Sequence, residues 1–262
     1  MSYTNVLERI HGLYQRHAAR ALNTRPLTLD LHTPIVSFTF DDFPRSALLT
    51  GGAILEQFGV RGTYYASFGL IGRDAPTGPI FVREDLPVLV ARGHELGCHT
   101  FDHCHSWNTT TPAFERSIIV NKIALEELMP GAAFRTFSYP ISPPRPRTKL
   151  VVAGRFSCAR GGGQTLNVGT TDLNYLRAYF LEKARDRPDD VQRVIDANRA
   201  KCGWLVLATH DVCKAPTSFG CTPDFFEDVV RRAVDSGARI LPVADALDSM
   251  VMSDQRAARG LW

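Results

Sequence analysis

Apolar residues near the amino terminus recur at helical spacing. The apolar positions are Val6, Ile10, Leu13 and Tyr14, and Arg and His side chains lie between them. This pattern predicts an amphipathic helix over residues 3–22. We expect this helix to pack on the body of the protein.

The rest of the pattern alternates short apolar runs with helical segments. The β-branched and aromatic run at 35–40 predicts a buried strand, and a helix over 46–58 with a strand at 62–67 completes a β-α-β unit. Further helices are expected near 83–92, 112–129, 223–236 and 243–252, and further strands near 95–98, 134–139, 204–209 and 239–241. Such alternation predicts an α/β fold with a parallel sheet, either open or closed into a barrel.

One segment departs from this alternation. Between residues 142 and 177 the helical signal is patchy, and prolines and a glycine triplet at 161–163 interrupt it. We expect this region to be rich in loops and to line a site rather than to join two domains. No repeat or linker divides the chain, so a single domain over residues 1–262 is expected.

Composition excludes several classes of protein. Hydrophobic residues make up 44% of the chain and charged residues 22%, as in ordinary globular proteins. The net charge is only +3 and no long run of one sign occurs, which argues against a nucleic-acid groove or a polybasic membrane anchor. No apolar run is long enough to span a bilayer, so membrane insertion is not expected.

The amino terminus and the cysteines bear on location. Charged residues occupy the place where a secretory signal needs an apolar core. The six cysteines form no dense disulfide framework and are expected to be reduced thiols. Both observations favour a cytoplasmic location.

Two carboxylates follow the predicted strand at 35–40. Side chains alternate along an extended backbone, so Asp41 and Asp42 point to different sides. One can then bind a metal while the other handles a proton. The alternative is that the pair only caps the following helix.

Two histidines follow another predicted strand. His99 and His103 are four residues apart, a spacing that reaches one ion if the backbone turns helical there. Two partly buried histidines that hydrogen-bond their neighbours are the simpler alternative. A structural zinc site using Cys98 and Cys104 is a second alternative, but no CxxC pair is present to complete four ligands.

His210 also follows a buried strand. Three predicted strand ends thus carry Asp or His, and ligands gather at the carboxyl ends of parallel strands. Helix capping explains one such coincidence more easily than three.

These segments resemble a known family. TFDD at 39–42, GHELGCHTFDH at 93–103, FSYP at 137–140 and LATH at 207–210 are similar, in this order, to the signature motifs of the polysaccharide deacetylases. This family is also called the NodB-homology fold or carbohydrate esterase family 4. The resemblance spans about residues 35–247 and implies an irregular (β/α) barrel of the NodB-homology type, here preceded by the amphipathic helix.

The resemblance also implies roles for individual residues. Asp41 would be the catalytic base and His210 the general acid. The metal ligands would be Asp42, His99 and His103, and they would hold one divalent transition metal. Zinc is the first choice, with Co²⁺, Ni²⁺ or Fe²⁺ as alternatives.

Other residues would support these groups. Thr100 would orient a ligand histidine, and Tyr139 and Pro140 would hold the acyl group. Trp107 would stack on a sugar ring or pack under its loop.

One motif departs from the family pattern. Many members carry, in the third motif, an arginine followed after two residues by an aromatic residue, but Arg135 lies four residues before Tyr139. In a branch of the family with an F-[AS]-Y-P motif a downstream arginine takes over, and CARG at 158–161 resembles that segment. Arg160 is therefore expected to hold the catalytic carboxylate.

The resemblance implies a metal-dependent hydrolase that removes an N-acetyl or N-formyl group from an amino sugar in a glycan or a glycan precursor. Two alternatives stay open. One is a hydrolase of non-sugar amides or ureides on the same fold. The other is a non-catalytic member that only binds carbohydrate.

Overall fold

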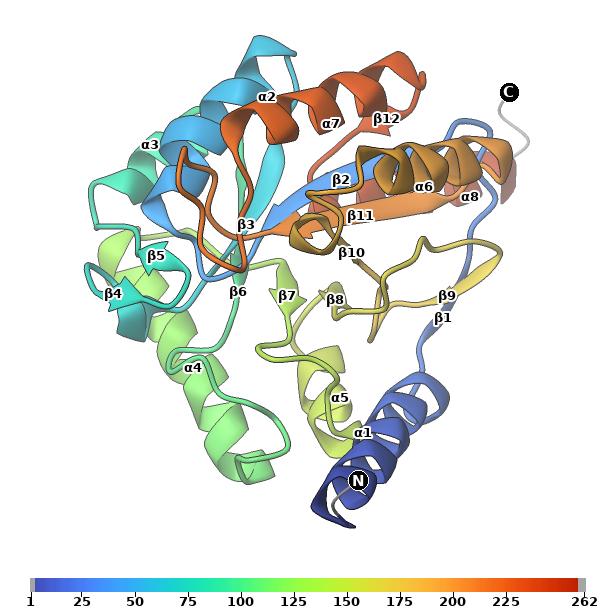
Figure 1. Cartoon of the computed structure of the whole chain (residues 1–262). Coiled ribbons are helices and arrows are strands. Elements are labelled where there is room, and N and C mark those ends of the chain that lie inside the picture. Colours follow the sequence, from blue (N-terminus) through green and yellow to red (C-terminus); the bar gives the residue numbers. More distant parts are fainter. Residues whose placement is uncertain (1–2, 259–262) are drawn as a thin grey trace.

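β2 (Ile35–Phe40) is an interior strand of one curled parallel sheet (Figure 1). The order of the sheet is β10-β11-β2-β3-β6-β7-β8, with β12 paired to β2 as well. The other strands of this sheet are β3 (Gly62–Ala66), β6 (Glu95–Cys98), β7 (Thr136–Ser138), β8 (Cys158–Arg160), β10 (Tyr179–Phe180), β11 (Trp204–Thr209) and β12 (Arg239–Ile240). The structure, a computed structural model, describes residues 3–258.

The predicted α/β fold with a parallel sheet is confirmed, and it is a half-barrel. All six residues of β2 are buried because both faces of the sheet are covered, which explains their continuous apolar pattern. β8 and β10 form the two ends of the sheet, and no pairing among the described strands closes it. The chain between these two strands crosses the opening instead.

Helices pack around the outside of the sheet (Figure 1). They are α1 (Tyr3–Ala21), α2 (Ala53–Gln57), α3 (Asp85–Ala91), α4 (Thr111–Leu128), α5 (Pro146–Ala153), α6 (Pro188–Ala200), α7 (Pro223–Asp235) and α8 (Val243–Ala258). A π-helical turn at Ala47–Gly52 precedes α2, and short 3₁₀ turns lie at Phe68–Leu70 and Leu181–Lys183. Thr110 and Thr222 cap α4 and α7 by accepting from Ala113 N and Phe225 N.

Two small antiparallel pairs lie beside the main sheet. β1 (Pro26–Thr28) pairs with β9 (Thr170–Asp172), and β4 (Asp74–Ala75) pairs with β5 (Gly78–Pro79). The first pair ties the chain after α1 to the segment that crosses the open side of the half-barrel.

The packing of α1 differs from the sequence prediction. Ala18 and Ala19 are its buried residues, whereas the side chains of Ile10, Leu13 and Tyr14 are each more than half exposed. The side chain of Val6 lies outside the described part of the chain. The helix therefore packs mainly through small residues near its carboxyl end, and its apolar stripe stays largely exposed.

A buried lysine fixes the end of α1. The Nζ of Lys149, on α5, donates to the carbonyl oxygens of Ala19 and Leu22 at 2.7 and 2.8 Å and to Asp172 Oδ2 at 2.7 Å. The lysine side chain is fully buried. Because three oxygens satisfy its three N–H groups, this ammonium group joins α1, α5 and β9.

Two smaller sequence predictions concern the cysteines and the membrane. All six cysteines are free thiols. Within residues 3–258, no helix combines the length and the apolar character needed to cross a bilayer.

Candidate active site

Polar residues from neighbouring strands meet at one edge of the sheet. Asp41 and Asp42 follow β2, His99 follows β6 and His210 follows β11. All these strands run parallel, so their carboxyl ends lie on the same side. The gathering of these residues is a consequence of the strand order β11-β2-β3-β6.

Asp42, His99 and His103 form a compact cluster. Their ligand atoms lie within 4.8 Å of one another. Asp42 Oδ1 lies 3.5 Å from His99 Nε2 and 3.1 Å from His103 Nε2, and Asp42 Oδ2 accepts from Thr77 Oγ1 at 3.0 Å. Apart from the two imidazoles, no donor among the described residues reaches the buried Oδ1. One carboxylate and two imidazole nitrogens suit a divalent transition metal with open positions.

The orientation of His99 is fixed from behind. Its Nδ1 lies 2.8 Å from the carbonyl oxygen of Ser138, which can only accept a hydrogen bond. The proton is therefore assigned to Nδ1, and Nε2 presents its lone pair to Asp42. Burial lowers the pKa of His99 to about 4, and this neutral form is the one that binds a metal.

The other two cluster residues influence each other electrostatically. Burial alone would raise the pKa of Asp42, but the imidazoles of His103 and His99 bring it well below its usual range. Burial would lower the pKa of His103, but the contact with Asp42 raises it above its usual value. Without a metal, Asp42 is therefore an anion, and His103 binds a proton more tightly than His99 does.

The turn between the two histidines is not helical, although a helical turn was the condition under which their four-residue spacing was expected to reach one ion. Thr100 and His103 both have left-handed backbones, with φ of 60° and 52°. The hydroxyl of Thr100 accepts from Cys104 N at 3.0 Å and closes the turn around His103. Thr100 thus contacts the loop that carries a histidine rather than the imidazole itself.

Neither cysteine beside this segment belongs to the cluster. Cys98 is buried and its Sγ accepts from Asn121 Nδ2 at 3.3 Å. Burial raises the pKa of the Cys98 thiol to about 11, so it is protonated at neutral pH. The described residues thus offer no thiolate shell for a structural zinc ion around Cys98 and Cys104.

Asp41 has a separate set of partners. The guanidinium of Arg160 contacts its Oδ1, Ser138 Oγ donates to the same atom at 3.1 Å, and its N–H donates to the Thr209 carbonyl. Burial opposes ionisation of Asp41, but Arg160, with His99 and His210, outweighs it and holds the pKa below the usual range. Asp41 is therefore a buried carboxylate that remains ionised.

Arg160 reaches Asp41 from the edge strand β8. Its side chain is 1% exposed and its guanidinium carbon lies 5.3 Å and 5.5 Å from the ring centres of Tyr65 and Phe180. Arg135, by contrast, pairs with Asp248 at the surface. Of these two arginines, only Arg160 belongs to the site.

His210 lies at the rim of the site. Its Nδ1 is 3.2 Å from the carbonyl oxygen of Phe219, so the proton is assigned to Nδ1 and Nε2 is free to exchange a proton. The neighbouring Asp211 accepts from the N–H and the hydroxyl of Thr217 and shapes the loop that follows.

Glu182 is a residue that sequence reasoning missed. It follows β10, the neighbour of β11, and its buried Oε2 has no hydrogen-bond partner among the described residues. Burial raises the pKa of Glu182, whereas the charge of His210 lowers it and that of Asp41 raises it. Glu182 thus lies within electrostatic range of both residues. A two-residue strand such as β10 has no recognisable sequence pattern, so no signal marked its end.

The residues predicted to bind substrate pack against other residues of the protein. The ring of Tyr139 is buried between Phe137 and Tyr175, its hydroxyl donates to the Asn174 carbonyl and its N–H donates to the Arg160 carbonyl. This placement differs from the prediction that its ring and backbone hold an acyl group, because both polar groups already have partners.

Pro140 and Trp107 complete this set. Pro140 is buried at the end of β7. Trp107 donates to the Pro143 carbonyl at 2.9 Å, and its ring meets the edges of His11 and Tyr14 of α1. Of the two readings of Trp107, these contacts favour packing under its loop.

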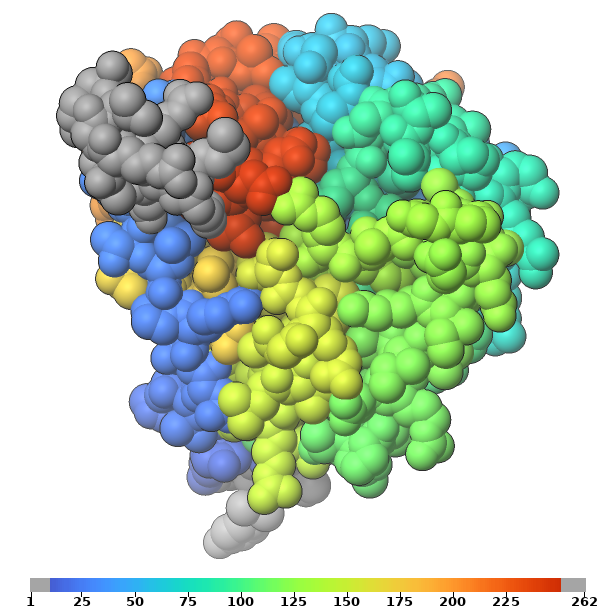
Figure 2. Space-filling view, turned by 180° about the vertical axis from the view of Figure 1, so that it is seen from behind, coloured from blue at the N-terminus to red at the C-terminus, as the bar shows by residue number. Residues whose placement is uncertain are grey.

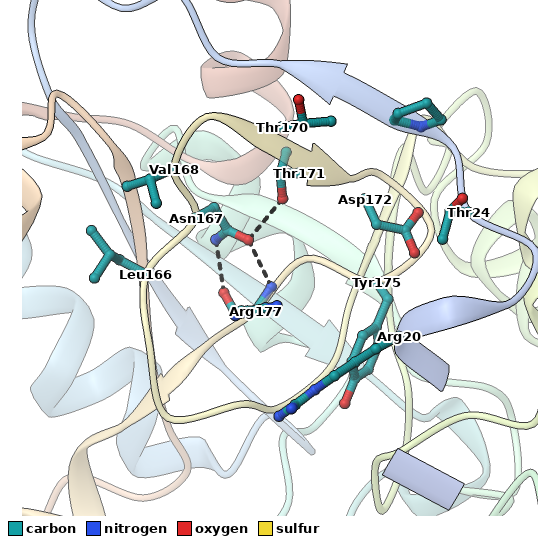
Figure 3. Close-up of a pocket in the computed structure, with 11 residues that line it drawn as sticks. Arg20, Thr24, Leu166, Asn167, Val168, Thr170, Thr171, Asp172, Tyr175 and Arg177 are labelled. Carbon is teal, nitrogen blue, oxygen red and sulfur yellow. Dashed lines mark hydrogen bonds between the residues drawn. The ribbon is translucent and has the colours of Figure 1, made fainter. Parts of the chain in front are cut away.

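A cavity of about 290 Å³ lies away from these residues, between α1, β1 and β9 (Figure 3). Arg20, Arg177 and Asp172 are among its lining residues, and Asn167 is hydrogen-bonded to the backbone of Arg177. None of the predicted catalytic or metal-binding residues lines it.

Comparisons with known proteins agree with this geometry. A family model described as polysaccharide deacetylase matches residues 29–153, a range that includes Asp41 and the three cluster residues. No curated protein matches the chain.

Solved structures share the fold at low sequence identity. A structure described as T48 deacetylase with substrate is 20% identical with a TM-score of 0.57, and the match covers 83% of this chain and 92% of that one. A family 4 acetyl xylan esterase from Clostridium thermocellum, in complex with a cobalt ion, is 20% identical with a TM-score of 0.57, over 80% and 89% of the two chains.

A wild-type pseudoenzyme of the same esterase family, from Bacillus anthracis, is 14% identical with a TM-score of 0.56, over 82% of this chain and 66% of that one. The half-barrel, the strand-end residues and the family model point in the same direction. The chain resembles the polysaccharide deacetylases of carbohydrate esterase family 4.

Proposed function

We propose that this protein is a metal-dependent hydrolase that removes an N-acetyl or N-formyl group from an amino sugar in a glycan or a glycan precursor. The observation that carries the proposal is the pair formed by Asp41 and Arg160 beside the Asp42, His99 and His103 cluster. An ionised carboxylate thus lies beside three residues that could hold a metal ion.

The cluster supplies the site for a metal. Asp42, His99 and His103 would hold one divalent ion, with zinc as the first choice. When bound, such an ion polarises the scissile carbonyl and lowers the pKa of water to about 7. The Thr77 hydroxyl and the Ser138 carbonyl hold two of the ligands in orientation from behind.

Asp41 acts as the general base in this proposal. Its carboxylate accepts a proton from the attacking water, and Arg160 and Ser138 keep it ionised and oriented. Because the pKa of Asp41 is lowered, its carboxylate is ionised at every pH at which the histidines of the cluster are unprotonated, so it can act as a base throughout that pH range.

His210 acts as the general acid. Its Nε2 is free because Nδ1 faces the Phe219 carbonyl, and it donates a proton to the nitrogen that leaves as the amine. Glu182 lies within electrostatic range of His210.

The proposal is tested by acetate or formate release with added zinc or cobalt. The substrates are N-acetylated and N-formylated oligosaccharides and lipid-linked sugar intermediates, and Asp41→Asn serves as the matched inactive control. A panel of ureides and non-sugar amides runs in parallel. If only the ureides and non-sugar amides are hydrolysed, the substrate of this site is a small amide and not an amino sugar.

A pseudoenzyme among the structural relatives makes the non-catalytic alternative concrete. Glycan binding that is unchanged by Asp41→Asn, without turnover of any substrate in either panel, would favour that alternative. The presence of an ionised base, a three-residue metal cluster and a free imidazole nitrogen supports catalysis instead.

A further inference from the structure

The outward side of α1 is apolar. Ile10, Leu13 and Tyr14 are 56%, 55% and 57% exposed, while Ala18 and Ala19 near the end of the helix are buried. Positions i, i+3 and i+4 share one side of a helix, so these three side chains form a stripe. The stripe is largely exposed, although the ring of Tyr14 meets that of Trp107.

The flank of this stripe is positively charged. Arg16 and Arg20 lie on α1 and are exposed, and no hydrogen bond or ion pair to another described residue engages their side chains. The carbonyls of Ala19 and Leu22, which an arginine at the end of a helix would otherwise cap, already accept from Lys149. Arg20 is therefore free to meet an external anion.

The neighbouring helix continues the same surface. Asn23 Nδ2 donates to the Pro146 carbonyl at 2.8 Å, which brings the exposed Arg147 and Leu150 of α5 beside the end of α1. Figure 2 shows the chain after α1, in blue, beside the yellow-green segment that contains α5. We call the residues Ile10, Leu13, Tyr14, Arg16, Arg20, Arg147 and Leu150 the α1–α5 face.

Three arginines of this face have no acidic partner among the described residues. They are Arg16 and Arg20 on α1 and Arg147 on α5, and the segments 9–29 and 128–171 that carry them contain no Asp or Glu. Most other basic residues of the second segment are paired with acids: Arg135, Lys149, Arg155 and Arg160 pair with Asp248, Asp172, Glu115 and Asp41. The positive charge of the face is therefore that of three arginines, which the fold brings together from two segments far apart in the sequence.

We propose that the α1–α5 face binds the surface of a bilayer that contains anionic lipids. Arginines beside exposed aliphatic and aromatic side chains are the pattern of a helix that lies in the interface, with its apolar side among the headgroups. Association with a second copy of the same face would bring like charges together. Surface binding of this kind needs no helix that crosses the bilayer.

The test measures binding of the full-length, metal-loaded protein to vesicles by flotation. We expect binding to vesicles of phosphatidylcholine with phosphatidylglycerol, weak binding to phosphatidylcholine alone, and a decrease with added salt. Removing two interfacial charges with Arg16→Gln and Arg20→Gln should weaken binding about thirtyfold at low salt. Ile10→Asn with Leu13→Asn should weaken it about tenfold or more.

A matched control comes from α4. Ile119 and Arg116 are also exposed on a helix, so Ile119→Asn with Arg116→Gln should leave vesicle binding unchanged. Thermal unfolding of every variant should match the wild type, since the altered side chains face outward.

Three results would overturn the proposal. The first is that the protein does not bind the anionic vesicles. The second is that the α4 control loses as much vesicle binding as the variants of the α1–α5 face. The third is that the protein binds no vesicles and instead forms a dimer, which Ile10→Asn with Leu13→Asn dissociates. The measurement does not depend on catalysis, so its failure leaves the proposed hydrolase activity untouched.

Discussion

The guanidinium of Arg160 contacts the carboxylate of Asp41, although 119 residues separate them along the chain. β8 is an edge strand of the sheet and β2 lies in its interior, so the curl of the half-barrel brings the two side chains together. The contact is almost fully removed from water, which strengthens its effect on the charge of Asp41.

Arg160→Ala should therefore impair turnover more than Arg160→Lys does. Lysine restores the charge but not the planar guanidinium, so it recovers activity only in part. Without the arginine, burial is left to raise the pKa of Asp41, and the acid limb of the pH–rate profile should move to higher pH. Metal content should stay at the wild-type level in both variants.

Arg135→Ala is the control for this series. Arg135 pairs with Asp248 at the surface and should leave the profile unchanged. An acid limb that stays in place in Arg160→Ala would mean that another group sets the charge of Asp41.

Asp41→Asn should keep the metal and lose turnover. The amide has the shape of the carboxylate but cannot accept the proton, and a positioned base contributes roughly 10² to 10⁴ in rate. Metal analysis and acetate release on the same preparation check both parts. Asp74→Asn, on the exposed β4, is a charge-matched control, and near wild-type activity of Asp41→Asn would assign the base elsewhere.

Metal binding should weaken as pH falls through the pKa of His103, which lies above its usual value, with a slope of about one proton. Contact with Asp42 raises the pKa of His103, so His103 must lose its proton before it binds. The pKa of His99 is already about 4, so His99 is neutral throughout this range. Competition with a metallochromic dye at several pH values measures the slope.

His105→Gln gives the control for this titration. His105 is a neighbour outside the cluster and its substitution should leave the slope unchanged. A slope of two protons near pH 6.5 would show that both ligand histidines titrate together.

Lys149→Met should lower the free energy of unfolding by about 3–5 kcal/mol, because it leaves Asp172 without its buried partner. It also leaves two carbonyls at the end of α1 without a donor. Urea denaturation of this variant and of Lys214→Met, at an exposed position, gives the comparison. Equal stability of the two would show that α1 is held by other contacts.

The longest strands were the most predictable parts of the fold. β2 and β11 are six-residue apolar runs, and both were placed at their observed bounds. The sequence did not reveal α5, α6, β8 or β10. β8 and β10 are only two or three residues long and depend on pairing with their neighbours, and α5 begins within a proline-rich stretch.

The orientation of α1 was wrong for a different reason. Periodicity shows which residues share a side of a helix, not which side meets the body. Here the small side chains of Ala18 and Ala19 allow close approach, and Lys149 fixes the end of the helix.

The candidate site followed from the strand ends and the motifs: Asp41, His99 and His210 lie directly after apolar runs, whereas Arg160 followed from the family resemblance. The structure gathers Asp42, His99 and His103, while their roles stay predictions. Glu182 could not be found in this way because the strand before it has no sequence pattern of its own.

The left-handed backbone around the cluster has a consequence for evolution. Phe43, Thr100 and His103 have φ of 54°, 60° and 52°, and such conformations cost about 1–3 kcal/mol each for non-glycine residues. Selection for stability alone would favour glycine or asparagine at these positions. A lineage released from selection for hydrolysis would then gain stability as its metal site decays, and inactive descendants of such a fold would be expected to persist.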